Sequence, residues 1–508
     1  MDNIYVLFIL ALIPIIWLIV SLGVLKIPGH KACPVALGLA LVLSIFVWKM
    51  SVLDTVTGAL EGIVMGLWPI VYIIIAAVFT YNLTTYSGSM DTIKKMMTSV
   101  SSDKRILVLI LAWGFGGFLE AIAGFGTAVA IPAGIMASLG FNPISAAVMC
   151  LIANTTPTAF GAIGLPVTTL AQVTNLDVMH LSFTVSIQLF VLILIIPFVL
   201  VMITGGGVKA IKGVFGITLA SGLAFAIPQI FVAKFLGAEL PAIVGSLICM
   251  AVTICMAKTF YKNSAAVDAE KVPVKTAFKA WLPFILVFVF IILCSSLFPV
   301  INSTLAKIKT SIPIYTGEGA KPYTFSWIAC PGTLIILATY VGGLLQGLTF
   351  KEISGVLLKT IKQMGKTALT VASIVGLAKV MGYSGMIGSI AMVLVAVTGI
   401  YYPLIAPIIG ALGTFVTGSD TSANVLFGSL QVKAAEAIHV DPYWIAAANM
   451  AGATAGKMIS PQSIAVATAA TGLIGSEGKI LTSTMKFCAI YVVIIGLVVF
   501  FGGPLLGY

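Results

Sequence analysis

Charge is what this sequence most lacks. Only 8% of its 508 residues are charged, 60% are apolar and the mean hydropathy is +1.15, whereas soluble domains carry about 25% charged residues. A water-facing surface cannot be built from this composition, so the sequence predicts an all-α, multi-pass membrane protein. Apolar runs long enough to cross a hydrocarbon core of roughly 30 Å lie at 4–24, 181–204, 238–257 and 281–300.

Catalytic and metal-binding patterns are missing as well. The three histidines and seven cysteines are dispersed, and no C-x-x-C, H-E-x-x-H or G-x-S-x-G motif occurs. We therefore expect no disulfide framework, no metal and no cofactor. A membrane-embedded enzyme needs a nucleophile with its base, or a set of metal ligands, so the sequence disfavours that class.

The net charge of +11 does not indicate a nucleic-acid partner. The lysines lie in short loops between apolar runs, which is the positive-inside pattern of membrane proteins. The lipid bilayer is the expected partner, and the bacterial cytoplasmic (inner) membrane is the expected location. The first apolar run lacks a basic leader and a small-residue cleavage site, so it predicts a retained helix. The sequence leaves open whether the protein is a monomer or a homo-oligomer.

Short motifs recur about 297 positions apart in this chain. ACP occurs at 32–34 and again at 329–331, and YSG occurs at 86–88 and again at 383–385. Ordered anchors of this kind predict an internal repeat. The expected division is an N-terminal transmembrane helix, a first repeat, connecting transmembrane helices with a basic cytoplasmic loop, and a second repeat, at 1–32, 33–204, 205–329 and 330–508.

Lysine placement predicts that the two repeats are inverted. No lysine lies between Lys379 and Lys433, after the second YSG, whereas four basic residues follow the first, namely Lys94, Lys95, Lys104 and Arg105. Because basic residues accumulate in cytoplasmic loops, equivalent places lie on opposite sides of the membrane. The same rule puts both termini outside and predicts cytoplasmic segments at 25–31, 205–212 and 258–279. Inverted repeats are typical of secondary transporters, with the site near the midplane, and a channel is disfavoured because nothing resembles a selectivity filter.

Helix-breaking residues interrupt each repeat twice. Glycine costs a helix about 1 kcal/mol and proline about 3, yet five glycines crowd one stretch, at 114, 116, 117, 124 and 126. This pattern predicts a re-entrant hairpin in each repeat, with tips at 120–127 and 417–422. A broken helix follows each hairpin, at 154–158 and at 454–462.

The four breaks predict a site for a small carboxylate. Free N–H groups at the N-termini of half-helices attract anions, and hydroxyl groups lie beside them. The alternative is that these small and hydroxyl residues only permit close helix packing. The expected substrate-binding residues are Gly124, Gly126, Thr127, Asn154, Thr155, Thr156, Ser419, Thr421, Ser422, Asn424, Thr454, Lys457, Ser460 and Gln462.

Ionisable residues within apolar segments are candidates for coupling. Such a residue costs about 2.5 to 3.5 kcal/mol on insertion scales, so we expect Glu120 and Asp420, at the two hairpin tips, to gain and lose protons. Permanent pairing with a lysine, or a wet helix end, is the alternative. Lys379 or Lys457 could pair with Asp420 or meet the substrate, unless it snorkels to the interface. Arg105, the only arginine, is expected in a cytoplasmic loop, which disfavours an arginine clamp.

Three long motifs resemble the L-lactate permease family. They are EAIAGFGTAVAIPA at 120–133, ANTTPTAFGAIGLP at 153–166 and GSDTSANVLFG at 418–428, and the resemblance runs over essentially the whole chain. It implies transport of lactate, and often glycolate, together with protons. It also implies an ion-transporter-superfamily-like fold with two inverted hairpin-bearing repeats and an elevator-type motion.

Residues and resemblance together predict alternating access by a symporter of protons and 2-hydroxymonocarboxylates. L-lactate is the first expected substrate, with D-lactate and glycolate beside it. The alternative within the transporter class is a sodium-coupled carrier of carboxylates, including dicarboxylates.

Overall fold

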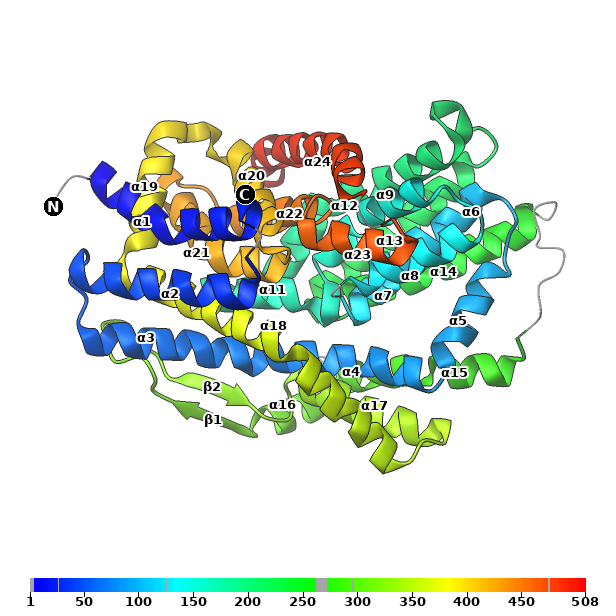
Figure 1. Cartoon of the computed structure of the whole chain (residues 1–508), viewed down its shortest axis with the longest axis horizontal. Helices are drawn as coiled ribbons and strands as arrows, with labels where there is room; N and C mark the ends of the chain where they lie inside the picture. The colour runs from blue at the N-terminus through cyan, green and yellow to red at the C-terminus, as the bar shows by residue number, and fades with distance from the viewer. Residues whose placement is uncertain (1–3, 26, 125, 262–271, 295–296, 474–475) are drawn as a thin grey trace.

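The computed structural model describes residues 4–25, 27–124, 126–261, 272–294, 297–473 and 476–508 (Figure 1). Within these ranges, eleven helical segments are long and apolar enough to cross a membrane. The first expected run forms α1 (Ile4–Leu18) and the π-helical turn η1 (Ile19–Val24). The prediction of a mainly helical, multi-pass membrane protein is therefore confirmed.

One group of long helices occupies the lower half of Figure 1, where α18 crosses α3 and α4 obliquely. Its centre is α18, which packs on α2, α3 and α4. Gly62 and Gly376 allow this close approach, since a Cβ on Gly62 would lie 2.6 Å from the Cα of Gly376. The group comprises α2 (Gly29–Phe46), α3 (Val52–Met65), η2 (Gly66–Val71), α4 (Tyr72–Tyr86), α15 (Val274–Leu293), α17 (Pro331–Gln346) and α18 (Phe350–Ser384).

A second group is built from shorter, broken helices and their neighbours. Its interior holds large side chains that are almost completely buried, including Trp113, Phe118 and Phe160. Its members are α6 (Lys104–Val108), η3 (Leu109–Phe115), α7 (Gly116–Ile122), α8 (Thr127–Ser138), α9 (Pro143–Ala153), α10 (Thr155–Thr158), α11 (Gly161–Thr174), α12 (Val178–Gly205), η4 (Val208–Ile211), α13 (Phe215–Leu236) and α14 (Pro241–Phe260). The short helix α5 (Ser89–Thr98) connects α4 to this group.

The C-terminal helices complete the second group. Helices α20 and α22 pack closely because Gly452 and Gly456 carry no side chain, and a Cβ on Gly452 would lie 1.9 Å from the carbonyl oxygen of Pro407. Small residues spaced four apart are a common device for helix contact in membranes. These helices are α19 (Met386–Thr398), η6 (Gly399–Tyr401), α20 (Tyr402–Thr417), α21 (Asp420–Ile438), α22 (Pro442–Lys457), α23 (Pro461–Thr471) and α24 (Glu477–Leu506).

A β-hairpin departs from the all-α prediction. Strands β1 (Lys309–Ile312) and β2 (Tyr323–Ser326) pair antiparallel after the short helix α16 (Pro299–Ala306), and the hairpin lies beside α3 in Figure 1. The apolar run at 281–300 is shorter as a helix than expected, because α15 ends at Leu293. Residues 262–271 of the expected basic loop at 258–279 lie outside the described residues.

Candidate functional site

Both predicted hairpin breaks are present. Helix α7 ends at Ile122 and α8 begins at Thr127, with Gly124 and Gly126 in the left-handed region at φ +58° and +87°. Only glycine adopts this region without strain. Glu120 lies one turn before the break, inside α7. Residue 125, within the expected tip, lies outside the described residues.

Three glycines of the crowded stretch do not break the helix. Gly114, Gly116 and Gly117 stay helical, and a Cβ on Gly114 would lie 2.6 Å from Cγ of Met250. The same substitution at Gly117 would meet the ring of Phe225 at 2.9 Å. These glycines serve helix packing, which was the alternative interpretation of the pattern.

The second hairpin breaks at Gly418, which has a φ of +71°. Helix α20 ends at Thr417, and α21 begins at Asp420 with Ser419 as its N-cap. The Ser419 hydroxyl accepts a 3.3 Å hydrogen bond from the backbone N–H of Ser422. The interruption predicted at 417–422 is confirmed.

The two broken helices differ from expectation in where they break. After α9, residues 155–158 form one helical turn, and the sharp deviation falls later, where Ala162, Ile163 and Gly164 are all left-handed. At the other predicted break, α22 stays helical through Thr454 to Lys457, and α23 starts at Pro461. The hydroxyl of Ser460 caps α23 by accepting from the N–H of Ser463 at 3.2 Å.

These four breaks surround one cavity of about 390 Å³, here called the central cavity. Helices α2 and α18 close its remaining sides. The predicted site residues that line it are Glu120, Gly124, Gly126, Ser419, Asp420, Thr421, Ser422, Lys457 and Gln462. Sequence reasoning therefore identified the hairpin contributions to this cavity.

The central cavity holds two buried carboxyl groups and one lysine. Glu120 and Asp420 are 3% and 2% exposed. Oε1 of Glu120 accepts a 3.0 Å hydrogen bond from Thr158, whereas its Oε2 and both oxygens of Asp420 have no hydrogen-bond partner among the described residues. Nζ of Lys457 donates to the carbonyl of Gly418 at 3.1 Å and forms no ion pair within the described chain. Lys457 and the two carboxyl groups are close enough to interact electrostatically.

Several predicted binding residues do not line the cavity. Their hydroxyl groups mostly bond to backbone carbonyls three residues earlier: Thr127 donates to the Gly124 carbonyl, Thr155 to the Ile152 carbonyl and Thr454 to the Ala451 carbonyl, at 2.7–2.8 Å. Asn424 donates to the carbonyl of Pro166 at 3.0 Å and so ties α21 to α11. The structure gives these four residues packing and bonding roles in the walls.

Asn154, just before α10, and Thr156, within it, are buried without lining the cavity. They are 2% and 0% exposed, and the polar side-chain atoms of both lack hydrogen-bond partners among the described residues. Buried polar groups are normally satisfied. Their side chains are therefore unbonded hydrogen-bond donors and acceptors close to the site.

Lys379 does not join Asp420, which corrects one sequence-based expectation. Its Nζ lies 3.0 Å from Oε1 of Glu61 on α3, and the hydroxyl of Tyr383 donates to the same oxygen at 2.6 Å. The two side chains meet because α3 and α18 pack against each other. Sequence spacing cannot show which helices will be neighbours, so this pairing was not predicted.

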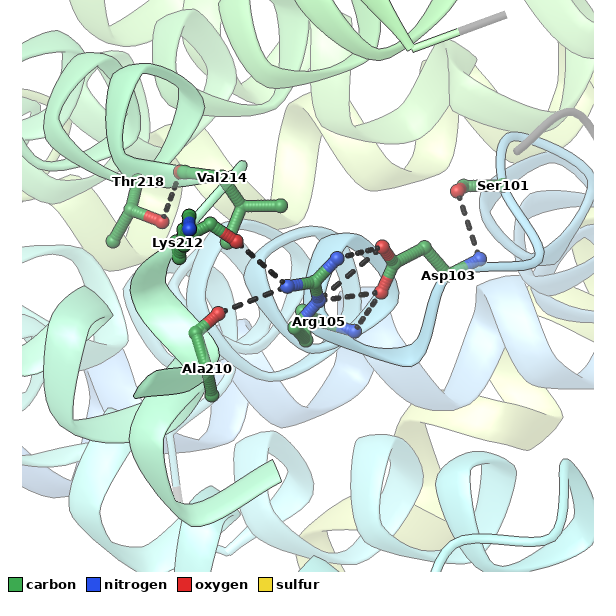
Figure 2. Close-up of polar contacts among 7 residues, drawn as sticks. All are labelled: Ser101, Asp103, Arg105, Ala210, Lys212, Val214 and Thr218. Atoms are coloured by element: carbon green, nitrogen blue, oxygen red, sulfur yellow. Dashed lines mark hydrogen bonds and ion pairs between the residues drawn. The ribbon is translucent and has the colours of Figure 1, made fainter. Parts of the chain in front are cut away.

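Arg105 lies in the first turn of α6 and bonds to Asp103, Ala210 and Lys212 (Figure 2). Asp103 caps α6, and its Oδ2 lies 2.8 Å from Nη2 of Arg105. Nη1 donates to the carbonyls of Ala210 and Lys212 at 2.9 and 3.1 Å, which joins α6 to the segment after α12. Arg105 was expected in a loop and instead lies in the first turn of α6. It does not line the central cavity, which agrees with the expectation that no arginine clamps the substrate.

Sequence reasoning missed the wall that the first helix group provides. From α2 come His30 and Cys33, and from α18 come Lys366, Thr367 and Thr370. Polar residues within an apolar helix were the only available signal. They lie far in sequence from the hairpins, so only the tertiary packing brings them to the cavity.

The chain is similar to several known proteins. The family model described as L-lactate permease matches residues 7–506. The L-lactate permease of Streptococcus iniae is 63% identical over 86% of this chain and 93% of its own length, and glycolate permease GlcA of Escherichia coli K12 is 36% identical over 96% and 94%. The solved YdaH transporter of Alcanivorax borkumensis is 12% identical with a TM-score of 0.46, covering 87% of this chain and 88% of that chain. The chain belongs to the L-lactate permease family.

Proposed function

We propose that this protein is a secondary transporter that carries L-lactate, and also glycolate and D-lactate, with protons across the bacterial cytoplasmic membrane. Its family membership and the names of its relatives support the substrate class. The observation that carries the proposal is the central cavity itself, where two buried carboxyl groups face an unpaired lysine between two helix breaks. The substrate binds there.

The substrate carboxylate is held by Lys457 and by helix N-termini. The first turns of α21 and α23 both line the cavity, at Asp420 to Ser422 and at Pro461 to Ser463. Free N–H groups and the helix dipole favour an anion at such ends. Lys457 adds a point charge that forms no ion pair within the described chain. In this proposal the hydroxyls of Thr421 and Ser422, which line the cavity, bond to the 2-hydroxyl group.

Glu120 and Asp420 take up the coupled protons. A buried, ionised carboxylate without hydrogen-bond partners is expensive, and Asp420 has none for either oxygen among the described residues. Protonation removes this cost and lets each group donate a hydrogen bond. Binding of one substrate anion together with protons then allows the cavity contents to cross the membrane without a large buried charge.

The proposed architecture is two inverted repeats, at 33–204 and 330–508, that move by an elevator-type motion. The hairpins α7–α8 and α20–α21 are the matching parts, and each is followed by a broken helix, α9–α11 or α22–α23. In this proposal the hairpins and broken helices move together against α2–α4 and α18, with 1–32 as an accessory helix and 205–329 as a connector. Both termini lie outside in this proposal.

Uptake by proteoliposomes tests this function. Purified protein is reconstituted, and labelled L-lactate or glycolate is offered with an imposed proton or sodium gradient. We expect accumulation driven by the proton gradient, abolished or uncoupled in Glu120→Gln and Asp420→Asn but normal in Asp91→Asn, which changes an exposed carboxylate on α5. Accumulation that follows sodium and ignores the proton gradient would instead establish the sodium-coupled alternative.

A further inference from the structure

A second cavity of about 780 Å³ lies beyond the central one, between the two helix groups. We call it the lysine vestibule. Its walls come from η2, α3, α18 and α19, from the end of α11, from the second half of α21 and from the β-hairpin. Its charged residues are Glu61, Lys321, Lys379 and Lys433. None of these residues lines the central cavity.

Three helices run from one cavity to the other in the same direction. On α18 the central cavity is lined as far as Ile374, and the vestibule begins at Ala378, one turn or about 6 Å further on. On α21 the two cavities are lined by Ser422 and Ser429, about 10 Å apart along the axis. Helix α11 behaves likewise, with its start at the central cavity and its end at the vestibule. Only a thin barrier therefore separates the two cavities.

Tight contacts between α11 and α21 form this barrier. The hydroxyl of Ser429 donates to the carbonyl of Val173 at 3.0 Å. A Cβ on Gly428 would lie 2.6 Å from Cδ1 of Leu170, so these helices touch with no room between them. A small molecule cannot pass between α11 and α21 in this arrangement. Because both helices belong to the proposed moving part, the central cavity reaches the vestibule only when they shift together past α18. This is the arrangement expected of the two ends of one transport path: the central cavity is closed off from the vestibule.

The charge of the vestibule suits an anion. Three lysines and one glutamate line it, a net charge of +2, whereas the lysines and carboxylates of the central cavity balance at two each. Lys379 is paired with Glu61 at 3.0 Å, and Lys433 with Glu436 at 3.1 Å. Lys321 is exposed and forms no ion pair among the described residues, so its charge is fully available.

The wall that carries Lys321 is held in place. The ring of Tyr315 stacks on Tyr383 of α18, with centroids 3.8 Å apart and an interplanar angle of 4°. Thr316 donates to Oδ1 of Asp54 at 2.7 Å, and the hydroxyl of Tyr323 donates to the carbonyl of Trp68. These anchors keep the hairpin loop at the rim of the vestibule.

We propose that the lysine vestibule is the entry site for the small carboxylate on the side of the membrane opposite to the central cavity, and that Lys321 draws the anion in. This inference rests on the proposed transport of carboxylates. By the positive-inside rule this is the external face, since the loops at 94–105 and 205–212 lie at the other end of the molecule (Figure 1). A cleft lined by charges of one sign raises the local concentration and the association rate of an oppositely charged ligand.

Initial uptake rates of labelled L-lactate in right-side-out vesicles test this role. Lys321→Gln should raise the apparent KM about threefold to tenfold at low ionic strength, with little change in maximal rate. The difference should fall below about twofold at 0.5 M salt, because screening is then nearly complete within a few ångströms. Lys321→Arg should restore the normal KM. The matched control is Lys309→Gln, an exposed lysine of the same hairpin that lines neither cavity.

The same variants in inside-out vesicles complete the test. Lactate offered from that face enters the central cavity directly, so Lys321→Gln should leave its apparent KM unchanged. Equal KM values for Lys321→Gln and Lys309→Gln in right-side-out vesicles would contradict the proposed role of the vestibule as the entry site. A rise in KM for Lys321→Gln that is the same from both faces would contradict it as well. Failure of the unsubstituted protein to take up lactate or glycolate would overturn the proposed function, and the vestibule with it.

Discussion

The hydroxyl of Thr158 donates a 3.0 Å hydrogen bond to Oε1 of Glu120, joining the first broken helix to the first hairpin. The same oxygen faces the backbone of Gly161, where a Cβ would approach it to 2.7 Å. Oε2 has no partner among the described residues. The orientation of the Glu120 carboxyl group therefore depends on the hydroxyl of Thr158 and on the absence of a side chain at Gly161.

Thr158→Val should lower both stability and transport. Valine keeps the shape but leaves Oε1 unsatisfied, which costs about 1–3 kcal/mol for a buried acceptor. Thr156→Val is the control, because its hydroxyl lies on the same turn, is fully buried and has no partner in the described chain. Thermal unfolding in detergent and lactate uptake should show a loss for Thr158→Val only. Equal losses in both variants would contradict the role given to Thr158.

Lys457→Gln should weaken substrate binding. A charged hydrogen bond contributes about 1.5–3 kcal/mol, so we expect the apparent KM for lactate to rise by roughly tenfold or more. Lys479→Gln, at an exposed site near the start of α24, removes the same charge away from the cavity. Kinetics of uptake by proteoliposomes provide the measurement, and an unchanged KM in Lys457→Gln would exclude this lysine from carboxylate binding.

Gly418→Ala should be more harmful than Gly472→Ala, although both glycines have nearly the same φ, +71° and +70°. The left-handed region costs an L-residue about 1–2 kcal/mol at either place. At Gly418 the added Cβ would also lie 2.1 Å from Oε1 of Gln462, whereas at Gly472 nothing lies within 4 Å. Because Gln462 lines the central cavity, only Gly418→Ala should alter the KM for lactate. Indistinguishable uptake kinetics would show that Gln462 moves aside freely.

Removal of either Glu61 or Lys379 should destabilise the protein, and removal of both should restore much of the loss. Breaking a buried ion pair leaves one uncompensated charge, at a cost of up to about 3–5 kcal/mol, which the 21% exposure of the Lys379 side chain reduces. We expect Lys379→Met to lower the unfolding temperature and Glu61→Gln with Lys379→Met to recover it. Additive losses in this double-mutant cycle would show that the two side chains do not interact.

The Asp103–Arg105 pair should stabilise the protein in a pH-dependent way. Burial raises the pKa of Asp103, but the hydrogen bonds and the charge of Arg105 outweigh it, and the pKa lies below its usual value. A lowered pKa gives stability that is present above the ordinary value of about 3.9 and is lost as the pH falls through the lowered value. Asp103→Asn should therefore unfold at a lower temperature than the unsubstituted protein at pH 7, with a smaller difference at pH 3. A difference that stays constant with pH would contradict this.

Arg105→Lys tests the geometry of the same pair without changing its charge. A lysine cannot reach both carboxylate oxygens and the carbonyls of Ala210 and Lys212 together, because only the guanidinium group is a planar fork. We expect a loss of about 1–3 kcal/mol in the free energy of unfolding. Lys94→Gln, which breaks an exposed pair with Asp91, should change the stability by less than about 1 kcal/mol.

Local features of the sequence predicted the membrane spans and the breaks in the two hairpins. Hydropathy and helix propensity act over short stretches, so the apolar runs, Gly124, Gly126 and Gly418 could be interpreted without knowing what surrounds them. The high cost of a charge in an apolar segment identified Glu120 and Asp420. The structure places both, with Lys457, at one cavity.

The sequence did not predict the side-chain pairs or the cavity walls from α2 and α18, because these depend on which helices are neighbours. Lys379 pairs with Glu61 because α3 and α18 are neighbours, and Gly114 packs against Met250 instead of breaking its helix. The strands at 309–312 and 323–326 are short and largely exposed, so no hydrophobic pattern marked them.

The sequence by itself determined that this protein lies in a membrane, where the helices break at Gly124, Gly126 and Gly418, and which buried charges it keeps, because each of these follows from the local free energy of a short segment. Only the tertiary structure decided that α18 supplies a wall to both the central cavity and the lysine vestibule. That choice depends on the packing of residues more than two hundred positions apart, whose contact energies no short segment contains.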